Sequence, residues 1–240
     1  HHLPLDPTPT TLSRYIAYTS QFIASGPKYL TGVRHFLRDL YPDFDINRQS
    51  PLVQSTIRGS KKVRADPIQR KLPFRRSHLA TFELLAKMSG SYDDLLFITI
   101  LSCCFYACHR SGELIWSNDK QLQDYRKLIK RSSVVFSDGR VQYHLPYHKT
   151  DPFYHGSDIL FTRQDIADPV HLLHDYITMR DARHGPQSPL FLCEDGSVPT
   201  RTWFDKRFFK IMGRDFGGHS LRAGGATFYA SLGLSESVIQ

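Results

Sequence analysis

The sequence predicts a mainly α-helical protein that carries one small antiparallel β-sheet. Apolar residues recur at spacings of three and four along most of the chain, which is typical of the buried faces of helices. Only one stretch changes to the alternating pattern of strands, around the turn dipeptide Asp138-Gly139. With 240 residues, 40% of them hydrophobic, the chain is long enough to bury a substantial core. We expect one large domain, or a small domain joined to a larger one.

Residues 1–58 predict a small all-α unit. A first helix should end at Gly26-Pro27 and a second at Tyr41-Pro42, because these dipeptides stop helices. A third, short helix is expected over residues 51–58. The positions expected to face inward on the first two helices are Leu12, Tyr15, Ile16, Thr19, Phe22, Ile23, Tyr29, Val33, Phe36, Leu37 and Leu40.

A basic, proline-broken segment over residues 59–76 follows and predicts an interdomain linker. Such a density of positive charge suits a segment that crosses a phosphate backbone, although a solvated surface loop would have the same composition. The residues expected to bind DNA here are Lys61, Lys62, Arg64, Arg70, Lys71, Arg75 and Arg76.

Residues 77–240 predict the larger, second domain. Helices are expected over residues 77–88, 92–109, 170–183, 202–212 and 221–232, with a hairpin over 133–145 and a third strand over 158–161. The apolar run over residues 95–107 predicts a core helix, because a membrane span needs about 20 apolar residues.

Lysine and arginine outnumber aspartate and glutamate by 31 to 23, which gives a net charge of +8. This charge favours a polyanionic partner such as nucleic acid, although it also serves solubility. Three of the four cysteines, Cys103, Cys104 and Cys108, share one apolar segment, so we expect buried thiols in a reducing compartment. Together with His109 they suggest zinc only weakly, because no second ligand pair stands at a suitable spacing. We expect no metal.

Four residues are of the types that assemble around a phosphodiester: Arg110, Lys149, His219 and Arg222. Arg110 ends the long apolar helix, where Glu113 could instead make it part of a structural ion pair. Lys149 follows the second strand in a polar turn and could protonate a leaving oxygen, although most surface lysines are only solvated. His219 and Arg222, at i and i+3, would leave one helix face and reach one phosphate, with a simple helix cap as the alternative.

Taken together, these side chains have complementary roles in breaking a phosphodiester. Two arginines can stabilise the charge that develops on the non-bridging oxygens, a lysine can protonate the leaving 5′ oxygen, and a histidine can transfer a proton. Gly217, Gly218, Gly224 and Gly225 flank the histidine and arginine pair and predict a crowded site. The attacking group could be water or a side-chain hydroxyl.

The order Arg, Lys, His-x-x-Arg in these contexts resembles the tyrosine recombinase family, also called phage-integrase-like DNA breaking-rejoining enzymes. The segment Lys149-Thr150-Asp151-Pro152-Phe153 with Gly156, and Gly218-His219-Ser220-Leu221-Arg222 with Gly233-Leu234, look like the eukaryotic mobile-element branch, such as cryptons. The resemblance implies a helical core-binding domain and an integrase-type α/β catalytic domain that enclose double-stranded DNA as a C-shaped clamp. It also implies DNA integration and recombination in the nucleus, self-association as a dimer or tetramer on DNA, no membrane and no cofactor.

By the same resemblance, Arg110 and Arg222 would bind the scissile phosphate, Lys149 would be the general acid, and His219 would assist proton transfer. Glu113 matches the acidic position that supports the first arginine. A 3′-phosphotyrosine intermediate is implied, with its nucleophile expected beyond Gln240.

Tyr229, the only tyrosine after Arg222, lies in an apolar stretch and is expected to pack rather than to attack. Two other interpretations stay open. The chain could be a catalytically inactive DNA-binding regulator or architectural protein derived from a recombinase, or a phosphodiesterase that uses water.

Overall fold

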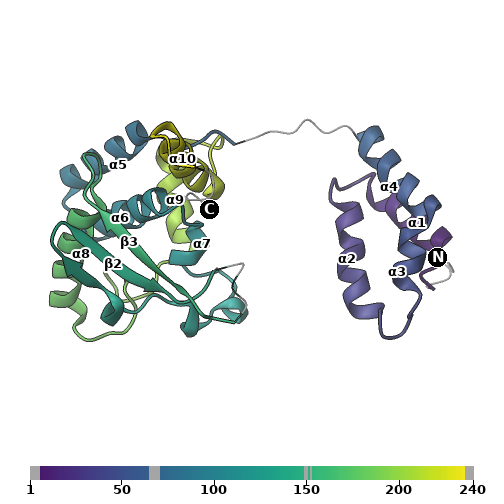
Figure 1. Ribbon diagram of the computed structural model, residues 1–240, viewed down its shortest axis with the longest axis horizontal. Helices are drawn as coiled ribbons and strands as arrows, with labels where there is room; N and C mark the ends of the chain where they lie inside the picture. The colour runs from purple at the N-terminus through teal and green to yellow at the C-terminus, as the bar shows by residue number, and fades with distance from the viewer. Residues whose placement is uncertain (1–5, 65–70, 149–150, 152, 236–240) are drawn as a thin grey trace. The chain divides into compact units, whose positions relative to one another are not determined.

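The computed structural model describes residues 6–64, 71–148, 151 and 153–235. The chain divides into two compact units, residues 1–69 and 70–240 (Figure 1). The architecture within them is mainly helical with one small antiparallel sheet, as the sequence predicts.

The first unit contains four helices: α1 (Pro9–Thr19), α2 (Gly26–Leu37), α3 (Phe44–Gln49) and α4 (Pro51–Arg64). Leu12 and Ile16 of α1 pack with Leu30, Phe44 and Val53 from the other three helices in a small core. The stripe expected on α1 is confirmed at Leu12 and Ile16. On the second helix the prediction was wrong at Tyr29, Phe36 and Leu40, which are exposed, and Phe22 is exposed as well. The helix α3 was not expected, because six residues are too few to show a helical period.

The expected linker over residues 59–76 differs from the structure at both ends. The helix α4 continues to Arg64, whose Nη1 donates to the Ser20 carbonyl at 3.1 Å and so joins α4 to the end of α1. On the other side, the backbone N–H of Phe74 donates to the Ser220 carbonyl at 3.0 Å, and the Phe74 ring is buried in the second unit. Residues 71–75 are irregular, as charge and proline content predict, but long-range contacts tie Arg64 and Phe74 to their own units.

The second unit is built around the apolar helix α6 (Tyr92–Tyr106), which is buried on nearly all sides (Figure 1). The helices that pack directly on it are α5 (Arg76–Ser89), α8 (Pro169–His184), α10 (Gly218–Ser231) and the short α7 (Ser111–Leu114). The helix α9 (Arg201–Met212) adds Phe204 and Phe208 to the same core, and short 3-10 turns lie at Lys120–Leu122, Tyr125–Lys127 and Arg131–Ser133.

The sheet has the strand order β1-β2-β3, all antiparallel. Its strands are β1 (Val135–Ser137), β2 (Arg140–Leu145) and β3 (Ser157–Thr162). Val141, Tyr143 and Leu145 alternate inward from β2 and are buried, so the central strand contributes every second side chain to the core. The register places the end of β2 and the start of β3 together, with the segment that contains Lys149 between them.

A buried arginine fixes the loop after α8. Arg180 is fully buried, and its guanidinium donates to the carbonyls of Gly185, Gln187, Pro189 and Leu190. Arg180 also pairs with Asp181, which in turn binds Arg131 at 2.7 Å. Because a buried guanidinium needs its donors satisfied, this loop is held in one conformation.

The end of α6 and the start of α10 approach each other at backbone distance. The chain leaves α6 through Cys108, which has a left-handed φ of 51°, and the His109 N–H bonds back to the Cys104 carbonyl at 2.9 Å. A Cβ on Gly225 would collide with the Phe105 carbonyl oxygen, and a Cβ on Gly224 would collide with the Phe74 carbonyl oxygen. The two glycines therefore let α10 lie against α6, as expected of a crowded site.

We predict that Gly225→Ala lowers the free energy of unfolding by about 3 kcal/mol, because the methyl group meets backbone that cannot swing aside. Urea denaturation followed by circular dichroism measures the change. Gly112→Ala is the matched control, since its Cβ would meet nothing within 4 Å. Equal stability of the two variants would contradict the close approach.

Candidate functional site

Arg110 lies directly after the turn that ends α6, with its guanidinium tied to Glu113. Arg110 Nη1 is 3.1 Å from Glu113 Oε1, and the backbone N–H of Arg110 donates to Glu113 Oε2 at 3.0 Å. The Arg110 side chain is one-third exposed, whereas that of Glu113 is only 9% exposed. The ion pair foreseen from the sequence is therefore present, and it leaves part of the guanidinium open to a ligand.

A buried polar chain extends from this ion pair to the sheet. His109 Nδ1 lies 3.2 Å from Glu113 Oε2, and His109 Nε2 lies 2.9 Å from the Tyr143 hydroxyl on β2. Burial raises the pKa of Tyr143, so its hydroxyl keeps its proton. An ionised carboxylate only accepts, so His109 Nδ1–H donates to Glu113, while Nε2 is hydrogen-bonded to the Tyr143 hydroxyl. The sequence suggests His109 only as a weak metal ligand, because its partner Tyr143 lies 34 positions away on β2.

The carboxyl group of Glu113 is held ionised in this setting. Burial alone would raise its pKa, but hydrogen bonds from the His109 ring, the Arg110 backbone and the Arg110 guanidinium outweigh burial and lower it. The ionised Glu113 orients the Arg110 guanidinium but occupies only some of its five N–H donors, so the other donors stay available to a ligand.

Arg222 reaches the same region from α10. Its Nη1 donates to the carbonyl of Cys108 at 3.1 Å, across 114 positions of sequence. Cys108 is two residues before Arg110, so the fold brings both predicted arginines to one turn of the chain. His219 lies in the first turn of α10 and is exposed, free to meet a ligand there.

Lys149 lies outside the described residues, but both flanks of its segment are anchored. The buried Asp151 carboxylate accepts from the backbone N–H of Gly156 at 2.7 Å and of Phe153 at 3.3 Å. These bonds, with that of Gly156 first, lower the pKa of Asp151 against the opposing effect of burial. Asp151 thus acts as the anchor of the turn, a role that its position in the motif alone did not reveal.

Aromatic contacts hold the same segment to residues 124–127. Lys127 Nζ lies 4.5 Å from the centroid of the Tyr147 ring, and the Tyr154 hydroxyl donates to Asp124 Oδ2 at 3.1 Å. The rings of Tyr147 and Tyr154 are 5.0 Å apart. The stretch that precedes the sheet therefore supports the segment in which Lys149 lies.

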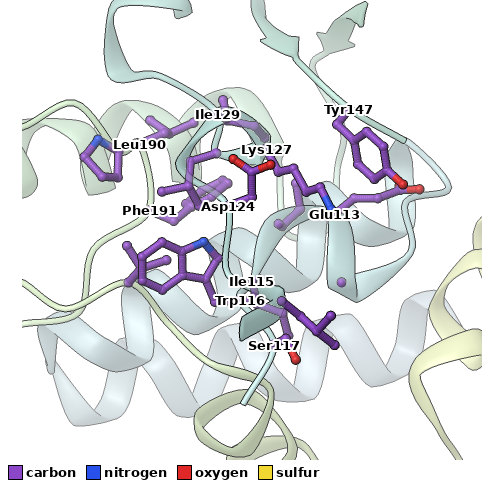
Figure 2. A pocket seen from close by; sticks show the side chains of 16 residues that line it. Glu113, Ile115, Trp116, Ser117, Asp124, Lys127, Ile129, Tyr147, Leu190 and Phe191 are labelled. Carbon is purple, nitrogen blue, oxygen red and sulfur yellow. The ribbon is translucent and has the colours of Figure 1, made fainter. Parts of the chain in front are cut away.

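A pocket of about 150 Å³ is lined by Glu113 and its neighbours Gly112 and Leu114. In Figure 2, Glu113 and Tyr147 lie at one end of it, and Leu190 and Phe191 lie at the other. Its wall at Leu190 is part of the loop that Arg180 fixes. Of the predicted catalytic residues that the structure describes, Arg110, His219 and Arg222, none lines this pocket.

The basic residues expected to bind DNA fall into three groups. Lys61, Lys62, Lys71 and Arg75 are exposed, and Arg70 lies outside the described residues. Arg64 is bound to the Ser20 carbonyl.

Arg76 has partners within its own unit. It pairs with Asp165, which raises its pKa, and its guanidinium lies 5.1 Å from the centroid of the Phe228 ring. These contacts join α5 to α10, so Arg76 contributes to the packing of the domain.

Tyr229 is built into the same packing. Its hydroxyl donates to the Tyr106 carbonyl at 2.7 Å, and burial raises its pKa to about 12. A phenol bound to a backbone carbonyl with a raised pKa is a poor nucleophile, which agrees with the expectation that this tyrosine packs.

All four cysteines are buried with free thiols, as the sequence predicts. Among the described residues, no group of three or more His, Cys, Asp or Glu side chains is arranged to hold a metal ion. No helix within the described ranges is both long and apolar enough to cross a membrane.

Comparison with solved structures identifies the fold. The chain is similar to the XerH site-specific recombinase, solved as a pre-cleavage complex with its difH substrate, with a TM-score of 0.55 and 14% sequence identity. The match covers 97% of this chain and 62% of that one. No family profile and no curated protein sequence matches the chain. The chain therefore has a tyrosine recombinase fold at a sequence distance where fold alone is shared.

We predict that Tyr143→Phe lowers the free energy of unfolding by about 1–3 kcal/mol, because His109 Nε2 then loses its buried hydrogen-bond partner. Tyr125→Phe is the control, since Tyr125 is 72% exposed and its hydroxyl makes no hydrogen bond in the described part of the chain. Chemical denaturation compares the two variants. The His109 contact has no role in stability if both variants unfold alike.

We predict that the free energy of unfolding falls less steeply with decreasing pH in Glu113→Gln than in the wild-type protein. The folded-state pKa of Glu113 is lowered, so its contribution is fully present above the unfolded value of about 4.3 and is lost as the pH falls through the folded value. Urea denaturation between pH 7 and pH 3 measures the slope. Glu194→Gln, at a half-exposed surface ion pair, is the charge-matched control. An unchanged acid slope in Glu113→Gln would refute the assignment.

Proposed function

We propose that this protein is a DNA-binding site-specific tyrosine recombinase, which cleaves and rejoins DNA strands through a 3′-phosphotyrosine intermediate. Arg110 and Arg222 bind the scissile phosphate, Lys149 protonates the leaving 5′ oxygen, and His219 assists proton transfer. Glu113 orients Arg110. The nucleophilic tyrosine is a residue other than Tyr229.

One observation carries this proposal: the hydrogen bond of Arg222 to the Cys108 carbonyl, which places α10 beside the Arg110 and Glu113 pair. Two guanidiniums and an imidazole on facing elements suit a phosphodiester that gains negative charge in its transition state. The net charge of +8 and the exposed lysines of α4 support DNA as the partner. The similarity to a DNA-bound recombinase supports the same conclusion.

The finer features follow from the resemblance in sequence motifs alone. They are the eukaryotic mobile-element branch, action in the nucleus, a C-shaped clamp around the duplex, and self-association as a dimer or tetramer on DNA. The structural match, at 14% identity, supports the fold and none of these finer features.

The Tyr229 hydroxyl is bound to a backbone carbonyl, which favours one competing function. In that function the protein is a DNA-binding regulator that does not cleave DNA. Both functions need duplex binding, and only the recombinase forms a covalent adduct. We predict that the natural full-length protein, given duplexes selected from a random pool and nicked near the exchange point, forms an adduct that denaturing electrophoresis resolves. Arg222→Ala should abolish it. Salt-sensitive binding without any adduct would favour the regulator.

Lys149→Ala should lower the cleavage rate about 100-fold or more and change DNA affinity little, because a general acid acts on the leaving group in the transition state. Single-turnover cleavage and filter binding measure the two quantities. A substrate with a 5′-bridging phosphorothiolate has a leaving group that needs no proton, so it should restore the variant's rate. Equal losses of rate and affinity, without that rescue, would reject this role.

A further inference from the structure

The pocket that Glu113 lines has the size and the wall of a binding site for one aromatic ring. Its volume is about 150 Å³, and its wall consists largely of aliphatic and aromatic side chains, among them Leu114, Ile129 and Phe191. A cavity of about 150 Å³ with a wall of leucine, isoleucine and phenylalanine is large enough to hold benzene. The volume therefore suits a single ring.

Trp116 contributes an unpaired hydrogen-bond donor to this wall. Its Nε1 is buried and has no hydrogen-bond partner among the described residues. In Figure 2 the nitrogen-bearing edge of the indole is turned toward the side of the pocket on which Phe191 and Asp124 lie. Buried donors normally have a partner, and one without a partner costs free energy. A ligand that accepts a hydrogen bond from Trp116 Nε1 would remove this cost.

Two charged side chains give the pocket further hydrogen-bonding groups. The Glu113 carboxylate accepts from His109 Nδ1, from the backbone N–H of Arg110 and from Arg110 Nη1. Because a carboxylate has about four acceptor positions, Glu113 can accept one more hydrogen bond. Lys127 lines the same pocket and has three N–H donors. A ring that matches this wall therefore carries acceptors for Trp116 and Lys127 and a donor for Glu113.

The pocket reaches the protein surface close to Arg110. Gly112 and Leu122 are the exposed residues of its lining, Leu122 by 65%. Gly112 is two residues after Arg110, whose side chain is one-third exposed. A ring that is joined to a phosphate at Arg110 would therefore find the opening nearby.

We propose that this pocket binds one pyrimidine-type ring, whose carbonyl oxygens accept from Trp116 and Lys127 and whose ring N–H donates to Glu113. Such a ring has two possible sources. It is either a free pyrimidine or a base of the bound DNA that leaves the helical stack beside the scissile phosphate. The DNA source rests on the proposed function.

Uracil tests the pocket in the whole chain. The sequence has two tryptophans, Trp116 and Trp203, so a ¹H–¹⁵N spectrum contains two indole N–H signals. We expect uracil to shift the Trp116 signal until the site is saturated. The Trp203 signal should stay unchanged, because Trp203 Nε1 already donates to Asp93 Oδ2 at 3.4 Å. No shift of the Trp116 signal, or equal shifts of both signals, would overturn the proposal.

Trp116→Phe removes the donor and keeps an aromatic ring. It should weaken uracil binding about fivefold, the effect of one lost hydrogen bond, with the backbone amides of Leu190 and Phe191 as the reporters. Benzene has no acceptor and should bind this variant and the wild-type protein equally. A loss of benzene binding equal to that of uracil would show altered packing and overturn the role of Nε1.

Two further variants complete this test. Trp203→Phe is the matched control, because it removes an equal indole N–H away from the pocket, and it should leave uracil binding unchanged. Lys127→Met removes the second donor from a partly exposed position and should weaken uracil binding about fivefold as well. Unchanged uracil binding in both Trp116→Phe and Lys127→Met would reject the site.

Duplex DNA distinguishes the two sources of the ring. If a DNA base occupies the pocket, saturating duplex should shift the Trp116 signal and prevent the uracil shift. If the ligand is a free pyrimidine, uracil should bind equally with and without duplex. A normal covalent adduct without uracil binding would reject the pocket and keep the recombinase. Uracil binding without any duplex binding would keep the pocket as a site for a free ring and reject the recombinase.

Discussion

The close packing of α10 on the end of α6 is the constraint on which the rest of the site depends. Gly224 and Gly225 allow the helix to lie against the carbonyls of Phe74 and Phe105, where a side chain would collide. Only at this separation does the Arg222 guanidinium reach the Cys108 carbonyl. Two glycines inside a helix lower its intrinsic stability by about 1 kcal/mol each, so tertiary packing must supply the difference. The two glycines thus lower the helix propensity of α10 and allow the Arg222 guanidinium to reach its position.

Hydrogen bonds link Tyr143 on β2 to Arg110 through the buried His109 and Glu113. The position of the sheet therefore determines where Arg110 lies. Each member satisfies the hydrogen-bonding group of the next, so loss of one leaves a buried polar group unpaired. The same strand, β2, leads toward the segment of Lys149. This strand therefore supports Arg110 through His109 and Glu113, which explains why a small sheet belongs to a mainly helical site.

Much of the fold follows from local pattern, and the errors have physical causes. The helix α6 and the hairpin were predicted because long apolar runs and a turn dipeptide carry strong signals. The linker was placed too broadly because lysine-rich helix ends and loops share a composition, and because the burial of Phe74 depends on α10, far along the chain. Arg76 lies at the end of a basic segment, which suggests a DNA contact, and the sequence gives no sign that Asp165 and Phe228 lie against it.

The sequence by itself determined the chemistry that is available: two arginines, a histidine and a supporting glutamate in a recognisable order, within helices whose apolar faces require a core. Arg110 and Glu113 could be paired from sequence because they are neighbours on one turn. Tertiary structure alone decided that Arg222 meets the Cys108 carbonyl, that His109 binds Tyr143, and that Ser111 faces Gly218. These contacts join residues far apart in the chain, and no local period records which distant groups packing will bring within hydrogen-bonding distance.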